Sequence, residues 1–142
     1  MEVIILMIYI CVLISASITD YRKLIIYDRV HIIIILLSLI QVHDLNYFTR
    51  IGGAILIALP FLVLAVRTDK FGGGDIKFIF ANSLFLGFAF SYGGILIGFT
   101  LVILQYGFRC IRSKTDKSRR IALAPYLSIG YIILILISEL KT

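Results

Sequence analysis

The chain has 142 residues, of which 61% are hydrophobic and only 15% are charged. A soluble domain is closer to about half apolar and about a quarter charged, so this composition excludes an ordinary water-soluble globule. The net charge of +6 would indicate nucleic-acid binding in a soluble protein, but in so apolar a chain it must first be compared with membrane topology. We therefore predict an all-α integral membrane protein in which residues 1–142 form one domain.

Successive apolar runs predict a bundle of about six transmembrane helices. The first run follows Glu2 and precedes its basic residues, so we interpret it as a retained helix and not as a signal peptide. The second run is interrupted by polar residues, His31 among them. The stretch Ile76–Phe108 would be about 50 Å long as one helix, whereas the hydrocarbon core is about 30 Å thick, so we place a break at Ser91–Gly94. In chain order the runs are Val3–Ile18, Val30–Val42, Ile51–Val66, Ile76–Phe90, Tyr92–Phe108 and Ile121–Ser138.

Basic residues mark one side of this predicted bundle. All of them except Arg50 and Lys141 fall in three connections, Asp20–Arg29, Arg67–Lys77 and Arg109–Arg120. The positive-inside rule therefore places these connections in the cytoplasm and both termini outside. The most basic connection has no aromatic residue and no known nucleic-acid module, so we expect it to contact anionic lipid headgroups and not nucleic acid.

Small residues recur at helical spacing in two of the runs. Gly94 and Gly98 lie four positions apart, as do Ala54 and Ala58. This small-xxx-small spacing lets two helices approach each other closely. We expect these residues to pack helices together and to take no part in chemistry.

Two carboxylates stand out by their positions. Asp20 ends the first helix and Asp75 begins the fourth, so both are expected at the same depth on the cytoplasmic side. Taken singly, Asp20 is an interfacial residue beside Arg22, and Asp75 is a helix N-cap. Taken together they predict a catalytic dyad, because two carboxyl groups about 3 Å apart share one proton. One group then takes a proton from water and the other protonates the leaving amine, with no metal or other cofactor.

The glycines before Asp75 fit this interpretation. Gly72, Gly73 and Gly74 allow a positive φ and a close approach of the backbone to an extended substrate. A phosphate-binding loop is excluded, because the Gly-x-x-x-x-Gly-Lys-Ser/Thr spacing is absent. The positive end of the helix dipole favours the anion of Asp75, so we expect Asp75 to ionise more readily than Asp20.

Three short motifs occur in a familiar order and together cover most of the chain. The "DYRKLIIYD" of Asp20–Asp28 contains the first carboxylate, "GGGD" of Gly72–Asp75 contains the second with Lys77 after it, and "APYLSIG" of Ala124–Gly130 begins the last helix. The second motif is similar to the Gly-x-Gly-Asp motif of intramembrane aspartic proteases. The ordered set resembles one group of them in particular, the type IV prepilin peptidases.

This resemblance implies an aspartic endopeptidase of the cell membrane. It implies that the enzyme removes the leader of prepilin-like precursors (pilins, pseudopilins or archaellins) at the cytoplasmic face, with Asp20 and Asp75 as the dyad and no cofactor. It also implies a minimal form that lacks the N-terminal cysteine-containing domain linked to methylation of the product. The sequence itself names neither the precursor nor the oligomeric state.

On the same resemblance, further residues are expected beside the site: Arg22, Asp28, Lys77 and Pro125. The chain also departs from the family pattern. Tyr27 and Asp28 stand where Pro and Asn are usual, and Ala124 replaces Gly. The first departure alters the turn after Asp20, so it affects the geometry of the substrate more than the chemistry.

Two other functions stay open. A small proton- or cation-coupled transporter would use Asp20 and Asp75 as ion sites, although both acids lie near one face and not at the midplane. A non-catalytic assembly factor for a pilus or a secretion system is the other, because the segment after Asp20 is altered. Solute uptake without a pilin substrate, or assembly by a variant that lacks both carboxylates, would distinguish these functions from a peptidase.

Overall fold

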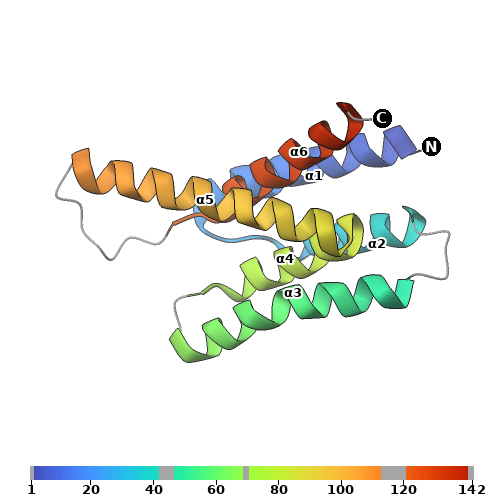
Figure 1. Cartoon of the computed structure of the whole chain (residues 1–142), viewed down its shortest axis with the longest axis horizontal. Helices are drawn as coiled ribbons and strands as arrows, with labels where there is room; N and C mark the ends of the chain where they lie inside the picture. Colours follow the sequence, from blue (N-terminus) through green and yellow to red (C-terminus); the bar gives the residue numbers. More distant parts are fainter. Residues whose placement is uncertain (1, 42–46, 69–70, 113–120, 141–142) are drawn as a thin grey trace.

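The computed structural model describes residues 2–41, 47–68, 71–112 and 121–140. Within these ranges the chain is all-α, with no strand, and its helices form one elongated bundle (Figure 1). The helices are α1 (Glu2–Lys23), α2 (Asp28–Gln41), α3 (Tyr47–Thr68), α4 (Gly73–Leu86), α5 (Phe88–Arg112) and α6 (Ala124–Leu140). The predicted all-α helical bundle is therefore confirmed.

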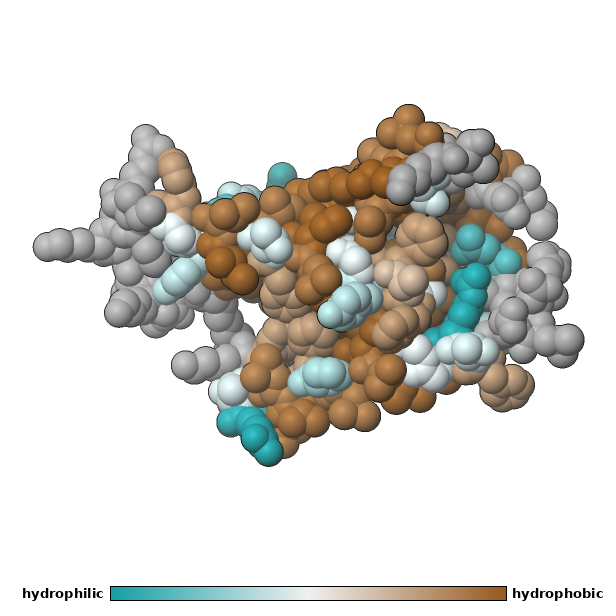
Figure 2. Space-filling view, viewed as in Figure 1, coloured by the Kyte–Doolittle hydropathy of each residue, from teal (hydrophilic) through white to brown (hydrophobic). Residues whose placement is uncertain are grey.

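Among the described helices, three are long and apolar enough to cross a membrane, over Val3–Lys23 in α1, Tyr47–Thr68 in α3 and Phe88–Phe108 in α5. A shorter apolar segment, Ala124–Ser138, lies in α6. Apolar residues, which are brown in Figure 2, cover most of the face that it shows. So large an exposed apolar surface needs lipid around it, so the chain is a membrane protein. α2 and α4 have 14 residues each, and at about 21 Å they are shorter than a hydrocarbon core of about 30 Å.

α4 occupies the middle of the bundle. It packs against α2, α3 and α5, while α6 packs against α1 and α5. Several of its side chains are buried, among them Phe78, Ile79 and Asn82. The start of α1 and the end of α6 lie at one end of the bundle, and the starts of α4 and α6 lie at the other (Figure 1). This arrangement agrees with the expectation that six helices bring both ends of the chain to one side.

Paired polar side chains connect α4 to its neighbours inside the apolar core. The hydroxyl of Tyr9 in α1 donates a hydrogen bond to Oδ1 of Asn82 at 2.6 Å. The Oγ atoms of Ser83 in α4 and Ser91 in α5 lie 2.8 Å apart. All four side chains are buried. A buried polar group that lacks a partner is costly, so these pairs fix which face of α4 meets each neighbour.

The break predicted at Ser91–Gly94 is wrong, because α4 and α5 meet instead at Gly87. Gly87 has a φ of 80° in the left-handed region that favours glycine, and its N–H donates to the carbonyl oxygen of Ser83. Nη1 of Arg50 donates to the carbonyl oxygen of Phe85 at 3.0 Å and so satisfies another group of this helix end. The Ser91–Gly94 segment lies inside α5, where Ser91 and Gly94 are buried.

The small residues of α5 have the packing role predicted for them. A Cβ atom added to Gly98 would lie 3.0 Å from the Cα of Leu127 in α6, and one added to Gly94 would overlap the ring of Tyr131. A Cβ atom on Gly130 of α6 would overlap the carbonyl oxygen of Gly94. The two helices therefore touch backbone to backbone, as small-xxx-small pairs allow. The alanines of the other pair, Ala54 and Ala58, are both buried.

Candidate active site

Asp20 lies in the last turn of α1 and connects it to the last helix. Its side chain is buried, with 4% of the residue exposed. Its Oδ2 accepts a hydrogen bond of 2.9 Å from the backbone N–H of Ala124, the first residue of α6. The first N–H groups of a helix have no partner within the helix, and a carboxylate is favoured there. Asp20 therefore caps α6 from a distant part of the chain.

The chain turns sharply just after Asp20. Leu24 has a φ of 55°, and its N–H donates to the carbonyl oxygen of Asp20 at 2.8 Å. A non-glycine residue in this left-handed region is uncommon and carries backbone strain. The turn ends α1 and brings Ile25 and Ile26 back beside the carboxylate, where both line the same cavity.

Asp75 lies in the first turn of α4, which Gly72 precedes as the N-cap. The N–H of Asp75 donates to the carbonyl oxygen of Gly72 at 3.0 Å. A Cβ atom at Gly72 would lie 3.0 Å from Oδ2 of Asp75, whereas nothing lies within 4 Å of one at Gly73. The predicted positive φ is wrong for Gly72, whose φ is −69°. Glycine here leaves space beside the carboxylate and does not serve an unusual backbone angle.

One cavity of about 290 Å³ brings the predicted site residues together. Asp20 and Asp75 both line it, and so do Asp28 and Lys77. The glycines Gly72, Gly73 and Gly74 complete its wall. The two carboxyl groups are close enough for the charge of Asp20 to act on Asp75. The cavity thus joins the end of α1 to the start of α4, as expected from their positions in the sequence.

The surroundings of the two carboxyl groups differ. Asp75 lies outside the three long apolar spans, and burial, with the charge of Asp20 beside it, raises its pKa to about 7 against the opposing hydrogen bond with Gly72. Asp20 instead accepts the N–H of Ala124. Asp75 therefore holds a proton at a pH where an ordinary carboxyl group is ionised. The helix dipole favours the anion of Asp75, so burial and the neighbouring charge outweigh it here.

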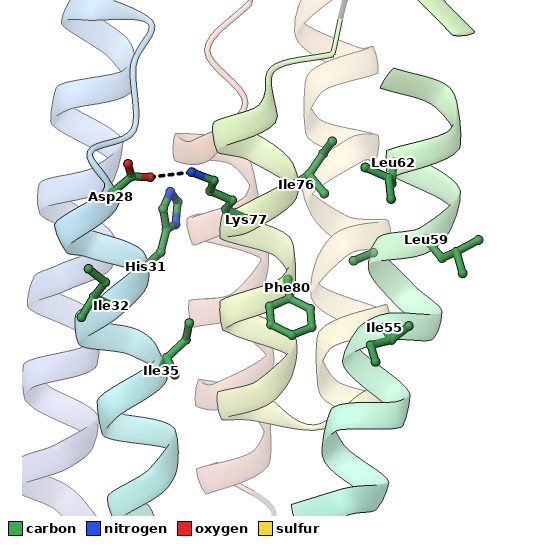
Figure 3. A pocket seen from close by; sticks show the side chains of 11 residues that line it. Asp28, His31, Ile32, Ile35, Ile55, Leu59, Leu62, Ile76, Lys77 and Phe80 are labelled. Carbon is green, nitrogen blue, oxygen red and sulfur yellow. Dashed lines mark hydrogen bonds and ion pairs between the residues drawn. The ribbon is translucent and has the colours of Figure 1, made fainter. Parts of the chain in front are cut away.

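Asp28 and Lys77 form an ion pair at the mouth of the cavity. Nζ of Lys77 in α4 lies 2.9 Å from Oδ1 of Asp28, the first residue of α2 (Figure 3). Both side chains are largely exposed, and the lysine lowers the pKa of the Asp28 carboxyl. The acid that replaces the usual Asn of the family pattern thus has a partner on α4.

A model of the type IV leader peptidase family matches residues 7–107, which include both carboxylates and the glycines. The chain belongs to the type IV leader peptidase family. Membership implies a peptidase with prepilin-like substrates, and it confirms the family recognised in the sequence motifs. Comparisons with curated proteins and with solved structures give no match.

Not every residue expected beside the site of this leader peptidase lies there. Arg22 is exposed on α1 and Pro125 lies in the first turn of α6, and neither is among the described residues that line the cavity. Most of the Arg109–Arg120 connection, for which lipid contact was expected, lies outside the described residues, at 113–120.

Two residues that lie next to the site of the leader peptidase were missed in the sequence. Ala124 was noted only as a departure from the family pattern, although its N–H holds Asp20. His31 was noted only as an interruption of an apolar run, although it lies below the ion pair in Figure 3. The position of His31, three residues after Asp28, could have indicated this, because residues i and i+3 share a helix face.

Proposed function

We propose that the protein is an aspartic endopeptidase that cleaves the leader from prepilin-like precursors. The observation that carries this proposal is that Asp20 and Asp75, from two different helices, line one cavity with three glycines. The family supplies the class of reaction and of substrate. The two carboxyl groups supply a chemical means of peptide hydrolysis that needs no other reactive side chain.

In this mechanism Asp20 is the general base and Asp75 the general acid. The Asp20 carboxylate takes a proton from a water molecule while the water oxygen attacks the carbonyl carbon of the scissile peptide bond. Protonated Asp75 donates a hydrogen bond to the carbonyl oxygen, which becomes negative in the transition state. When the tetrahedral intermediate breaks down, Asp75 gives its proton to the leaving amine and a new carboxyl group is released. The proton that Asp20 took from the water then passes to Asp75 and restores the starting state.

The glycines serve the substrate in this proposal. Nothing lies within 4 Å of a Cβ position at Gly73, so the wall of the cavity is open there. An extended peptide can approach the backbone of Gly72–Gly74 and present its carbonyl group to the two acids. A side chain at Gly72 would instead crowd the Asp75 carboxylate.

We place this site at the cytoplasmic face of the membrane, with both termini outside. Arg22 and Lys23 lie in the last turn of α1, and Arg67 lies in the last turn of α3. These helix ends are at the same end of the bundle as the start of α4, which carries Asp75 (Figure 1). The positive-inside rule favours the cytoplasm for that end.

The test is cleavage of a co-expressed prepilin by Asp20→Asn and Asp75→Asn variants. Each change keeps the shape of the side chain, and Asn at position 20 can still accept the N–H of Ala124. We expect each variant to lose at least about 100-fold in rate, the usual contribution of general acid–base catalysis. Glu2→Gln, at the far end of α1, loses the same charge and should cleave normally.

Normal shortening of the prepilin by either Asp→Asn variant would rule out the dyad. Membrane insertion and thermal unfolding of each variant should match those of the unchanged protein, so that lost activity is not lost folding. A double variant that still supports pilus assembly without cleavage would favour an assembly factor instead.

A further inference from the structure

A second cavity, of about 640 Å³, runs along the bundle from α2 across α4 to α3 (Figure 3). We call it the lateral groove. Its walls are mostly apolar, with Ile35 from α2, Phe80 from α4, and Ile55 and Leu59 from α3. Its polar lining residues, Asp28, His31 and Lys77, gather at the end where α2 and α4 begin. The groove therefore has a polar mouth and an apolar length.

His31 at this mouth is buried without a hydrogen-bond partner. Only 4% of the residue is exposed, and neither Nδ1 nor Nε2 has a partner in the described structure. A neutral imidazole carries one donor and one acceptor, and buried polar atoms are almost always paired. Figure 3 shows the ring between α2 and α4, beneath the Asp28–Lys77 pair. An occupant of the groove that brings a polar group to this point would satisfy it.

The lateral groove adjoins the candidate active site. Asp28 and Lys77 line both cavities, so an occupant of the groove that reaches this ion pair lies next to the cavity of Asp20 and Asp75. A third cavity, of about 610 Å³ between α3 and α5, is a useful contrast. Its described lining, which includes Leu56 and Phe99, is almost wholly apolar and shares no residue with the active-site cavity. A lipid chain suits the third cavity. A lipid chain in the lateral groove, by contrast, would leave His31 without a hydrogen-bond partner.

We propose that the lateral groove docks the apolar helix of the substrate, with the first turn of that helix at Asp28, His31 and Lys77. This inference rests on the proposed function. The resemblance to prepilin peptidases implies that the leader of the precursor is followed by a hydrophobic helix and that cleavage occurs where the two meet. A helix begins with four N–H groups that have no partner within the helix, and its N-terminus carries a partial positive charge. The Asp28 carboxylate and the His31 imidazole are acceptors for such groups in an otherwise apolar setting.

The length of the groove sets how much of the helix it holds. From Asp28 to Ile35 along α2 is about two helical turns, or about 10 Å. Docking of the first two turns fixes the register, so that the residues before the helix extend toward the glycines and the two carboxylates. Binding of the helix start at the mouth then determines which peptide bond lies in the active site.

The first experiment detects binding without cleavage. A photo-crosslinking residue replaces Leu59 in the lateral groove or Leu56 in the third cavity, both on α3, in an Asp75→Asn protein reconstituted with a prepilin. We expect crosslinks to the first two turns of the prepilin helix from position 59 and none from position 56. Equal crosslinks from both positions, or lipid adducts alone from position 59, would overturn the docking site.

The second experiment measures kinetics with the active protein. Leu59→Trp fills the groove, whereas Leu56→Trp adds the same side chain on the other side of α3. We expect Leu59→Trp to raise KM for the prepilin at least about tenfold with kcat retained, and Leu56→Trp to change neither. His31→Phe, which removes the acceptor but keeps the ring shape, should raise KM also. An unchanged KM in both groove variants refutes docking even where the Asp→Asn variants are inactive, so the two proposals fail separately.

Discussion

The two sides of the bundle differ in how their helices meet. On one side, α5 and α6 touch through Gly94, Gly98 and Gly130, where even a Cβ atom has no room. On the other side, α2 and α3 both pack on α4 but leave a groove of about 640 Å³ between large side chains. The closed side is a fixed support, and the open side can admit a ligand.

The candidate active site lies where these two sides join. Asp20 belongs to the closed side, because it is buried and caps α6. Asp75 belongs to the open side, because it starts α4 directly beside the mouth of the groove. In the proposed mechanism, the general base is therefore held by a fixed helix end and the general acid lies beside the groove.

The largest expected effect on stability comes from Gly130→Val, which disrupts the contact between α5 and α6. The added atoms would overlap the carbonyl oxygen of Gly94, and backbone cannot move aside as a side chain can. Overpacking typically costs about 1–3 kcal/mol and occasionally more, and we expect this substitution to exceed that range and prevent folding. The measurement is the yield and thermal unfolding of purified protein. Gly107→Val in α5 meets nothing within 4 Å and should fold normally, so equal yields would contradict the backbone contact.

A smaller loss of stability is expected from Tyr9→Phe, which removes the hydrogen bond between α1 and α4. The change leaves Oδ1 of Asn82 buried without its donor, which should lower the free energy of unfolding by about 1–3 kcal/mol. Chemical unfolding in detergent measures this. Tyr92→Phe, on the exposed surface of α5, is the matched control. Replacing both partners, as Tyr9→Phe with Asn82→Leu, should recover part of the loss; no recovery would show that the hydrogen bond is not the cause.

The pH dependence of stability tests the difference between the two carboxyl groups. The pKa of Asp75 is raised from 3.8 to about 7, so the folded protein keeps a proton that the unfolded chain releases. Stability should therefore decline as pH rises from about 4 to about 7 and become level above that. The slope should be shallower in Asp75→Asn. Cleavage should also fall about tenfold per pH unit above about 7, because the general acid is lost. Cleavage that rises steadily to pH 9 would contradict this assignment.

The smallest effect on stability is expected from Lys77→Met. The Asp28–Lys77 pair connects α2 to α4, but both side chains are largely exposed and screened by solvent. Thermal unfolding should therefore be unchanged within measurement error, although the pair lines both cavities. A clear drop in unfolding temperature would mean that the ion pair, and not the packing of α2 and α3 on α4, holds the open side in place.

Periodicity and charge were sufficient to predict the number of helices, their class and the shared end of Asp20 and Asp75. They could not choose between Gly87 and Ser91–Gly94 as the end of α4, because each segment contains glycine. Whether a glycine ends a helix or packs one depends on what faces it, here Tyr131 against Gly94. The same limit hid the N–H of Ala124, which lies 104 positions from Asp20. Contacts at that separation leave no local pattern to read.

Because Asp20 caps α6, the two aspartates should differ in how readily they are replaced in relatives that have lost the enzymatic role. A copy released from selection for cleavage would still be under selection to fold, if only to avoid degradation. Asp75 has no comparable contact to another helix among the described hydrogen bonds, so its replacement costs the folded state less. Relatives that have lost the enzymatic role but kept the fold should therefore differ at position 75 first, with the aspartate at position 20 still in place.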